Sequence, residues 1–237
     1  MKLKLIYLFI IIVLILVLYL LRNQIIGVFF NLKEKQTIET VLKKYSSKVK
    51  VSLKNNFEIN SITFDDFEMA ILAFKKEQVV ELYVRKNETD NWKLLKKYPF
   101  TAFSGTMGPK LKNGDKQIPE GIYKMEYLNP NSSYHLSIKV NYPNTFDKEK
   151  ANLEQRTDLG GDIMIHGKSV TIGCIPVGDD TIEEIFVLAS KAKNVNFPII
   201  IAPHDFRTNK LFPQIETISW EKELYTSISK ELANFKI

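Results

Sequence analysis

A thiol and an imidazole lie close together in one short stretch of the sequence. Cys174 is the only cysteine in the chain, and His166, one of three histidines, precedes it by eight residues. A thiolate is the nucleophilic form of cysteine, and an imidazole can take the thiol proton and later return it to a leaving group. Glycines stand beside both, Gly167 after the histidine and Gly173 before the cysteine. The stretch predicts a nucleophile, a base and, around Gly173, backbone N–H groups that could hold an oxyanion.

The same residue types also fit a structural pair, because free cysteine is among the most buried residue types and a histidine can lie in a core. A single cysteine excludes an intramolecular disulfide. In an exported protein a lone thiol is open to oxidation, which favours a reactive role for it there. The histidines and the cysteine show no zinc-binding spacing. We therefore expect neither a metal nor a cofactor.

The elements that must position the pair can be predicted from hydropathy patterns. Residues 162–166 alternate and predict a strand that ends at His166, and a short connection returns the chain to Cys174. The pattern from Asp180 onward predicts a helix, and a Cys174 near its positive N-terminus would have a favoured thiolate. His135 is expected at the surface of a half-buried strand. His204 is expected in a partly exposed loop.

The remaining patterns predict a chain with several strands and a few helices. Strands are expected at 79–85, 92–101, 121–128, 134–140 and 198–202. Helices are expected at 31–47, at 63–76 and from 212 onward. Residues 103–124 are dense in Gly and Pro and predict a long structured loop, and 141–158 predict an irregular one. In and beside these loops we take Ser104, Lys110, Gly167 and Lys168 as candidate substrate-binding residues.

The N-terminal segment has the composition of a membrane anchor. Residues 5–21 are an unbroken uncharged run, almost all large and apolar, and residues 25 and 26 can extend it. A cleaved signal peptide is the alternative, but no small-residue cleavage site of the A-x-A kind follows. We therefore expect a single membrane pass through residues 5–26 with the folded part outside the cytoplasm. The predicted division is an anchor at 1–30, a juxtamembrane helix or linker at 31–60, a catalytic domain at 61–207 and a helical tail at 208–237.

The positive charge of the chain is local. Residues 1–50 carry nine Lys or Arg and two Glu, whereas the other 187 residues carry 24 basic and 25 acidic side chains. A nucleic-acid-binding domain would instead show a basic face on its folded part. The distribution therefore argues against a nucleic-acid partner.

Three stretches, in this order, resemble the L,D-transpeptidase catalytic domain family (YkuD-type), and within it the murein transpeptidase branch. The first is the lead-in at 65–85. The second is S-G-T-M-G-P-K-L-K-N-G-D-K-Q-I-P-E-G-I-Y at 104–123. The third is G-D-I-M-I-H-G at 161–167 followed by T-I-G-C-I-P at 171–176. The resemblance covers roughly residues 61–207.

The resemblance implies a mainly β fold with peripheral helices (α+β), a β-sandwich of the YkuD type. It implies Cys174 as nucleophile, His166 as proton donor and acceptor, and the backbone at Gly173 near the oxyanion. The implied substrate is a peptidoglycan stem peptide, attacked at the carbonyl of its third residue, usually meso-diaminopimelate, with release of the terminal D-alanine. The resulting thioester would pass to an amine, which makes a cross-link, or to water.

The sequence departs from the commonest pattern of that family at two positions. Ile172 stands where most members have a histidine two residues before the cysteine, and Pro176 stands where most have an arginine two residues after it. Similar departures occur in the branch that it resembles, which includes proteins that release wall-linked lipoprotein. Three hypotheses follow: an L,D-transpeptidase, a Cys-His amidase that uses water, and a wall-binding module without turnover.

Overall fold

The computed structural model describes residue 7 and residues 10–19, 21–22 and 35–236. The chain divides into two compact units, Met1–Gln36 and Thr37–Ile237. Residues 10–19 of the first unit are helical. No helix within the described ranges has the length and apolar character needed to span a bilayer. The anchor predicted at 5–26 lies partly outside these ranges.

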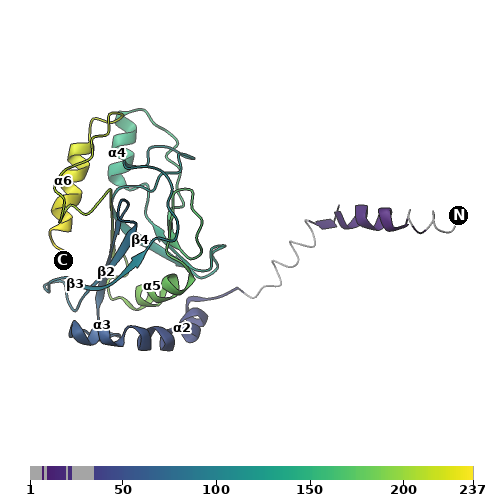
Figure 1. Ribbon diagram of the computed structural model, residues 1–237, viewed down its shortest axis with the longest axis horizontal. Helices are drawn as coiled ribbons and strands as arrows, with labels where there is room; N and C mark the ends of the chain where they lie inside the picture. Colours follow the sequence, from purple (N-terminus) through teal and green to yellow (C-terminus); the bar gives the residue numbers. More distant parts are fainter. Residues whose placement is uncertain (1–6, 8–9, 20, 23–34, 237) are drawn as a thin grey trace. The chain divides into compact units, whose positions relative to one another are not determined.

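The second unit is built on one curled sheet with helices around it (Figure 1). Eight strands of the described chain run in the order β3-β2-β1-β8-β4-β5-β6-β7. The pairs β1–β8 and β6–β7 are parallel and the others antiparallel. The strands are β1 Glu68–Phe74, β2 Val79–Arg85, β3 Lys93–Pro99, β4 Gly121–Asn129, β5 Ser137–Val140, β6 Met164–His166, β7 Ile175–Pro176 and β8 Pro198–Ala202. A mainly β fold with peripheral helices is thereby confirmed.

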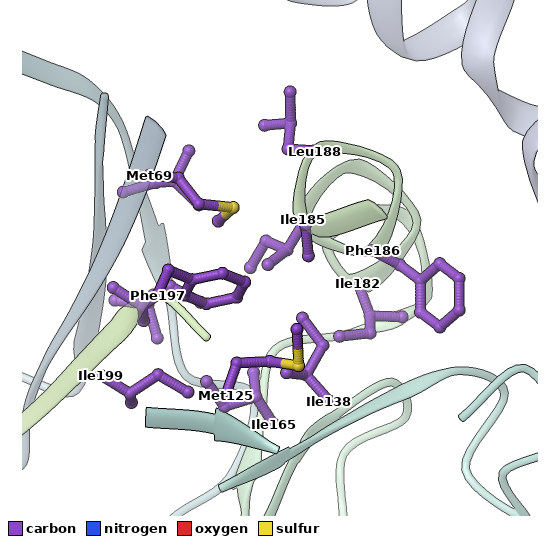
Figure 2. Close-up of a cluster of buried hydrophobic side chains, with 14 of the residues drawn as sticks. Met69, Met125, Ile138, Ile165, Ile182, Ile185, Phe186, Leu188, Phe197 and Ile199 are labelled. Atoms are coloured by element: carbon purple, nitrogen blue, oxygen red, sulfur yellow. The ribbon is translucent and has the colours of Figure 1, made fainter. Parts of the chain in front are cut away.

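Helices cover both faces of the sheet. They are α2 Ile38–Ser52, α3 Lys54–Ile59, α4 Thr145–Leu153, α5 Asp179–Lys191 and α6 Glu221–Leu232. One core cluster joins the sheet to α2, α3 and α5, and a second joins it to α6. Figure 2 shows Met125, Ile138 and Ile165 of the sheet facing Ile182 and Ile185 of α5. Side chains alternate along a strand, so the neighbours of Ile138 on β5 and of Ile165 on β6 project from the opposite face of the sheet.

The helix predicted at 63–76 is wrong, because this segment is β1. Met69 and Ile71 pack into the α5-side cluster, while Ala70 and Leu72 pack into the α6-side cluster. A strand buried on both faces is apolar throughout, and hydropathy periodicity alone cannot distinguish such a run from a buried helix.

The predicted loop at 141–158 contains α4. Asn144 and Asp147 form a reciprocal capping box, in which each side chain accepts the backbone N–H of the other residue. The box satisfies two N–H groups that have no partner within the helix. Asn144 therefore fixes where the helix begins.

The first helix of the second unit belongs to the compact body. Thr37 caps α2, which begins seven residues later than the predicted helix. Its residues Val41, Tyr45 and Val49 are buried and belong to the same cluster as α5. The second compact unit therefore begins at Thr37, whereas the predicted catalytic domain begins at residue 61.

Candidate active site

His166 and Cys174 lie on neighbouring parallel segments. Ile165 pairs with Ile175 and His166 with Pro176, so Cys174 lies beside Met164, two positions before the histidine. Ile165 faces the α5-side core (Figure 2), so the side chains of Met164 and His166 project from the other face. Residues in register on parallel strands share a face, which places Cys174 on the same side as His166.

The sulfur of Cys174 contacts two backbone groups. The Met164 N–H donates to Sγ at 3.4 Å, and the thiol donates to the carbonyl oxygen of Asp162 at 3.5 Å. Burial raises the pKa of the Cys174 thiol, and the Met164 hydrogen bond and the charge of Lys139 oppose this rise. The sequence predicted a favoured thiolate only for a cysteine near the N-terminus of this helix. The helix α5 begins at Asp179, five residues after Cys174, and burial has the largest effect on the thiol pKa.

The imidazole of His166 is held in one tautomer. Its Nδ1 lies 2.6 Å from the carbonyl oxygen of Gly167. A carbonyl oxygen can only accept, so Nδ1 carries the proton and Nε2 is left as the basic nitrogen. The ring of Tyr134 lies over the imidazole, with centroids 4.6 Å apart and a tilt of 36°. Burial lowers the pKa of His166, so at neutral pH the ring is uncharged.

A tight turn delivers the cysteine. Gly173 has φ +131°, and a Cβ there would lie 3.0 Å from the carbonyl oxygen of Gln117. The hydroxyl of Thr171 accepts the Gly173 N–H at 3.1 Å and donates to the carbonyl of Cys174 at 2.7 Å. The turn therefore requires a residue without a side chain at 173, because both the backbone angle and the Gln117 contact exclude one.

The residues after His166 are fastened to the start of α5. Asp179 accepts the backbone N–H of Lys168 at 2.8 Å and pairs with its Nζ at 2.6 Å. A Cβ on Gly167 would lie 2.6 Å from the Asp179 carboxylate and 2.7 Å from the carbonyl of Tyr134. Lys168, a candidate substrate-binding residue, is thus tied to Asp179, and close packing explains the glycine at 167.

The long loop between β3 and β4 lies against this turn through Gln117. Within the loop, Nζ of Lys110 is buried and binds the Asp115 carboxylate at 2.6 Å and the carbonyl of Lys112 at 2.8 Å. The hydroxyl of Ser104 is buried and has no hydrogen-bond partner. Lys110 therefore braces the loop, whereas the Ser104 hydroxyl is unsatisfied.

A buried ion pair anchors the base of the same loop. Lys75 lies 2.8 Å from Glu120 with both side chains fully buried, and it also donates to the carbonyls of Gly108 and Ile118. Glu120 in turn accepts hydrogen bonds from the Gly108 N–H and the Tyr225 hydroxyl. The two limbs of the loop are thus held together by one network.

The other two histidines lie apart from the pair. His135 precedes β5 and its Nε2 lies 2.9 Å from a carboxylate oxygen of Glu183. His204 was expected in a partly exposed loop, but it is buried against the ring of Phe206. No cluster of potential metal ligands occurs within the described part of the chain.

Several groups around the pair were not identified from the sequence. Tyr134 fits the alternation of a predicted strand, so nothing in the sequence indicated that its ring lies over His166. Lys139, which is buried beside Met164 and pairs with Asp162, reads as the polar face of a strand. The contact of Gln117 with Gly173 joins residues 56 positions apart in the sequence and only the folded chain reveals it.

The model of the L,D-transpeptidase catalytic domain (YkuD) matches residues 68–201. YafK of Escherichia coli strain K12, an L,D-transpeptidase by provisional assignment, is 36% identical over 124 residues, which is 52% of this chain and 47% of YafK. YafK of strain O157:H7 gives the same values. The chain therefore spans about half the length of the curated relatives that it matches.

Solved structures show a looser similarity. The helical cell shape determining protein Pgp2 from Campylobacter jejuni is 17% identical with a TM-score of 0.47, over 73% of this chain and 71% of Pgp2. Bd1075 of Bdellovibrio bacteriovorus is 25% identical with a TM-score of 0.42, over 70% of this chain and 56% of that one. The family match rests on the sequence model, which spans more than half of the chain. The chain belongs to the L,D-transpeptidase catalytic domain (YkuD) family.

Proposed function

We propose that the chain is a peptidoglycan L,D-transpeptidase in which Cys174 is the nucleophile and His166 the proton carrier. The observation that supports this best is their placement on one face of adjacent strands, with Nδ1 of His166 committed to Gly167. A fixed tautomer leaves Nε2 as the acceptor for a proton from the thiol side.

In the proposed first half-reaction, the thiol and the imidazole both start uncharged. Nε2 of His166 takes the thiol proton as Sγ attacks the carbonyl carbon of the third stem residue. The C–N bond to D-alanine then breaks, and His166 returns the proton to the departing amine. A thioester to Cys174 remains. Because the thiol pKa is raised, proton removal accompanies attack, without a preformed thiolate.

In the second half-reaction an acceptor amine attacks the thioester carbonyl. His166 takes a proton from that amine and delivers it to the sulfur as the C–S bond breaks, which restores the thiol. The developing oxyanion needs N–H donors in both halves. The Gly173 N–H is occupied by Thr171, so the adjacent Cys174 N–H is the donor that we assign, with the Thr171 hydrogen bonds holding the turn in place.

We also propose that residues 5–26 hold the protein in a membrane with the catalytic unit on the extracytoplasmic side. The support is the uncharged run at 5–21 in the sequence and the location of the proposed substrate. Stem peptides and wall-linked lipoprotein would both be within reach there. A protease added to spheroplasts and to lysed cells tests the orientation, because an extracytoplasmic unit is cut in both and a cytoplasmic one only after lysis.

The test of the activity uses the full chain, its Cys174→Ala and His166→Gln variants, and His135→Gln as a matched histidine control. Each is incubated with disaccharide-tetrapeptide muropeptides and with wall that bears attached lipoprotein, and products are read by mass spectrometry. Release of D-alanine with dimer formation, present in the parent and in His135→Gln and absent in the other two, is the expected result.

Other outcomes assign other functions. Monomeric cleavage products or freed lipoprotein that depend on Cys174 would make the chain an amidase with water as acceptor. Absence of any Cys174-dependent product on both substrates would contradict catalysis, and wall sedimentation would then test a binding module.

A further inference from the structure

A hollow of about 480 Å³ opens beside the candidate active site. Its walls come from β4, β5, the connection that follows β5 and the first turn of α4. Three charged side chains line it: Glu126 of β4, Lys139 of β5 and Lys148 of α4. The volume lies within the range of small-ligand sites, which is roughly 300–1,000 Å³. We call it the Glu126–Lys148 hollow.

A row of side chains links the hollow to the cysteine. Lys139 pairs across the strands with Met164, and the Met164 N–H reaches Sγ of Cys174. Met125 and Ile138 face α5 (Figure 2). Lys139 follows Ile138 and therefore projects from the same side as Cys174, and Glu126 lines the hollow together with Lys139. Adjacent strands lie about 4.8 Å apart, so the Lys139 backbone lies roughly 10 Å from that of Cys174. A side chain of four or five carbons on a residue held at Cys174 can reach that far.

Two of the three charged side chains of the hollow are free to bind a ligand, and the third has an exposed partner. Glu126 and Lys148 are both exposed, and within the described part of the chain neither side chain forms an ion pair or a hydrogen bond. Lys139 is almost fully buried, and its partner carboxylate on Asp162 is 92% exposed. The amide of Asn141, by contrast, already accepts the Lys124 N–H. The hollow therefore has one exposed carboxylate, on Glu126, and one exposed ammonium group, on Lys148, and the ammonium group of Lys139 is held at its wall by Asp162.

The mixture of charges selects the kind of ligand. An anionic ligand would be repelled by Glu126, and a cationic ligand would be repelled by the two lysines. A group with an ammonium and a carboxylate on one carbon can satisfy all three, since each of its charges finds an opposite partner. Specificity of this kind depends on repulsion of singly charged analogues as much as on attraction.

We propose that the Glu126–Lys148 hollow binds a zwitterionic amino-acid centre, with Glu126 on the ammonium and Lys148 and Lys139 on the carboxylate. The inference rests on the proposed function, because it places the free end of a long diamino-acid side chain there while the carbonyl of the same residue lies at Cys174. A free amino acid offers the same chemistry and is the alternative source.

Binding tests this proposal separately from catalysis. The full chain with Cys174→Ala is titrated calorimetrically with three stem tetrapeptides that differ at the third residue: meso-diaminopimelate, its side-chain carboxamide, and lysine. The first has the zwitterion, whereas the other two keep the ammonium and lack the carboxylate. We expect the first to bind at least about tenfold more tightly than either of the others, as loss of a charged hydrogen bond predicts.

Two variants in that background identify the residues. Lys148→Gln should bring the carboxylate and carboxamide peptides to nearly equal affinity. Glu126→Gln should bring the diaminopimelate peptide and its side-chain N-acetyl form to nearly equal affinity. The matched controls are Lys222→Gln on α6 and Glu149→Gln on α4, exposed residues outside the hollow, and both should keep the full discrimination.

Each outcome decides the proposal. Equal binding of the three peptides by the parent, or unchanged discrimination in both hollow variants, would overturn it. Free D-alanine that displaces the peptide at comparable concentration, and fails to bind to Lys148→Gln, would keep the site and assign it to free amino acids. Intact discrimination together with no Cys174-dependent product would refute the proposed reaction and leave the hollow as a ligand site.

Discussion

The backbone N–H of Met164 donates a hydrogen bond to Sγ of Cys174 at 3.4 Å. This contact joins the nucleophile of the proposed reaction to the strand that ends at His166. It also accounts for part of the electrostatics of the sulfur, since an N–H donor favours the thiolate while burial disfavours it. The balance lies with burial, and this can be measured directly because the chain has a single thiol.

Alkylation of Cys174 should stay slow at neutral pH. Burial raises the thiol pKa above its ordinary value of 9.0, so the iodoacetamide rate should keep increasing beyond pH 9. Intact-mass kinetics between pH 6 and 10.5 measure the midpoint, and the urea-unfolded chain is the reference. Lys139→Met should move the midpoint higher, because that cation favours the thiolate. A folded midpoint below the unfolded one would refute the burial argument.

The acid side of the pH profile should depend on Tyr134. Burial lowers the pKa of His166 from its usual 6.5. As the pH is lowered, kcat/KM should therefore stay constant through pH 6.5 and fall only at a lower pH, where the imidazole becomes protonated. Tyr134→Ala uncovers the ring, which raises the pKa and moves the acid limb to higher pH. The measurement is kcat/KM from pH 4.5 to 8 for parent and variant. Identical acid limbs would mean that Tyr134 does not shield the imidazole.

Gly173→Ala should reduce both stability and turnover. A methyl group would lie 3.0 Å from the Gln117 carbonyl, at a backbone φ of +131° that only glycine adopts readily. Strain of this kind costs about 1–3 kcal/mol. Urea unfolding and turnover would be compared with Gly161→Ala, where no atom lies within 4 Å of the added carbon. Equal effects of the two substitutions would contradict the crowding at 173.

Removing one partner of the buried ion pair should be costly. Glu120→Gln leaves the Lys75 ammonium without a counter-charge, and a broken buried pair costs about 3–5 kcal/mol of unfolding free energy. Lys75→Met combined with Glu120→Gln should lose less than the sum of the single variants. Urea unfolding of the parent, the two single variants and the double variant gives the coupling energy of the pair. The exposed Lys54–Glu58 pair is the control and should show little coupling. Additive losses at Lys75 and Glu120 would exclude coupling.

Asp147 should make the protein less stable as the pH rises from 4 to 7. Burial raises the pKa of its carboxyl from 3.8 to about 6. The folded chain therefore holds this proton more tightly than the unfolded chain does. Its contribution is complete below about pH 4 and is lost as the pH rises through 6, which amounts to about 2–3 kcal/mol.

The measurement for Asp147 is a comparison of slopes. Asp147→Asn should gain stability relative to the parent between pH 4 and 7 in urea unfolding. Glu149→Gln, exposed on the same helix, should keep a constant offset. A constant offset for Asp147→Asn as well would show that folding does not raise the pKa of this carboxyl.

Local patterns predicted strands whose ends are clearly marked in the sequence. The predicted ranges at 79–85 and 198–202 coincide with β2 and β8. The segment of β1 was assigned to a helix because packing on both sides erases the period-two signal. The helix α4 was missed because its nine residues include only one fully buried apolar side chain, Ala151. Its capping box was the available signal.

Only the residues of the 166–174 stretch could be predicted as part of the candidate site. His166, Cys174 and the two glycines are close in sequence, so their proximity follows from a short connection. The surroundings that set their chemistry come from elsewhere: Tyr134 and Lys139 from the region of β5, and Gln117 from the long loop. The direction of the Cys174 pKa shift depends on burial by these distant segments. The predicted strand and helix on either side of Cys174 carry no information about that burial.

The burial of Val41, Tyr45 and Val49 on α2 also sets a lower limit on the fragment that can be produced for study. Each such side chain contributes roughly 1.5–3 kcal/mol when it is fully buried. A protein fragment that starts at residue 61, where the family resemblance begins, would expose the apolar surface that these three side chains cover. Such a fragment should aggregate, whereas one that starts at Thr37 keeps α2 and its cap.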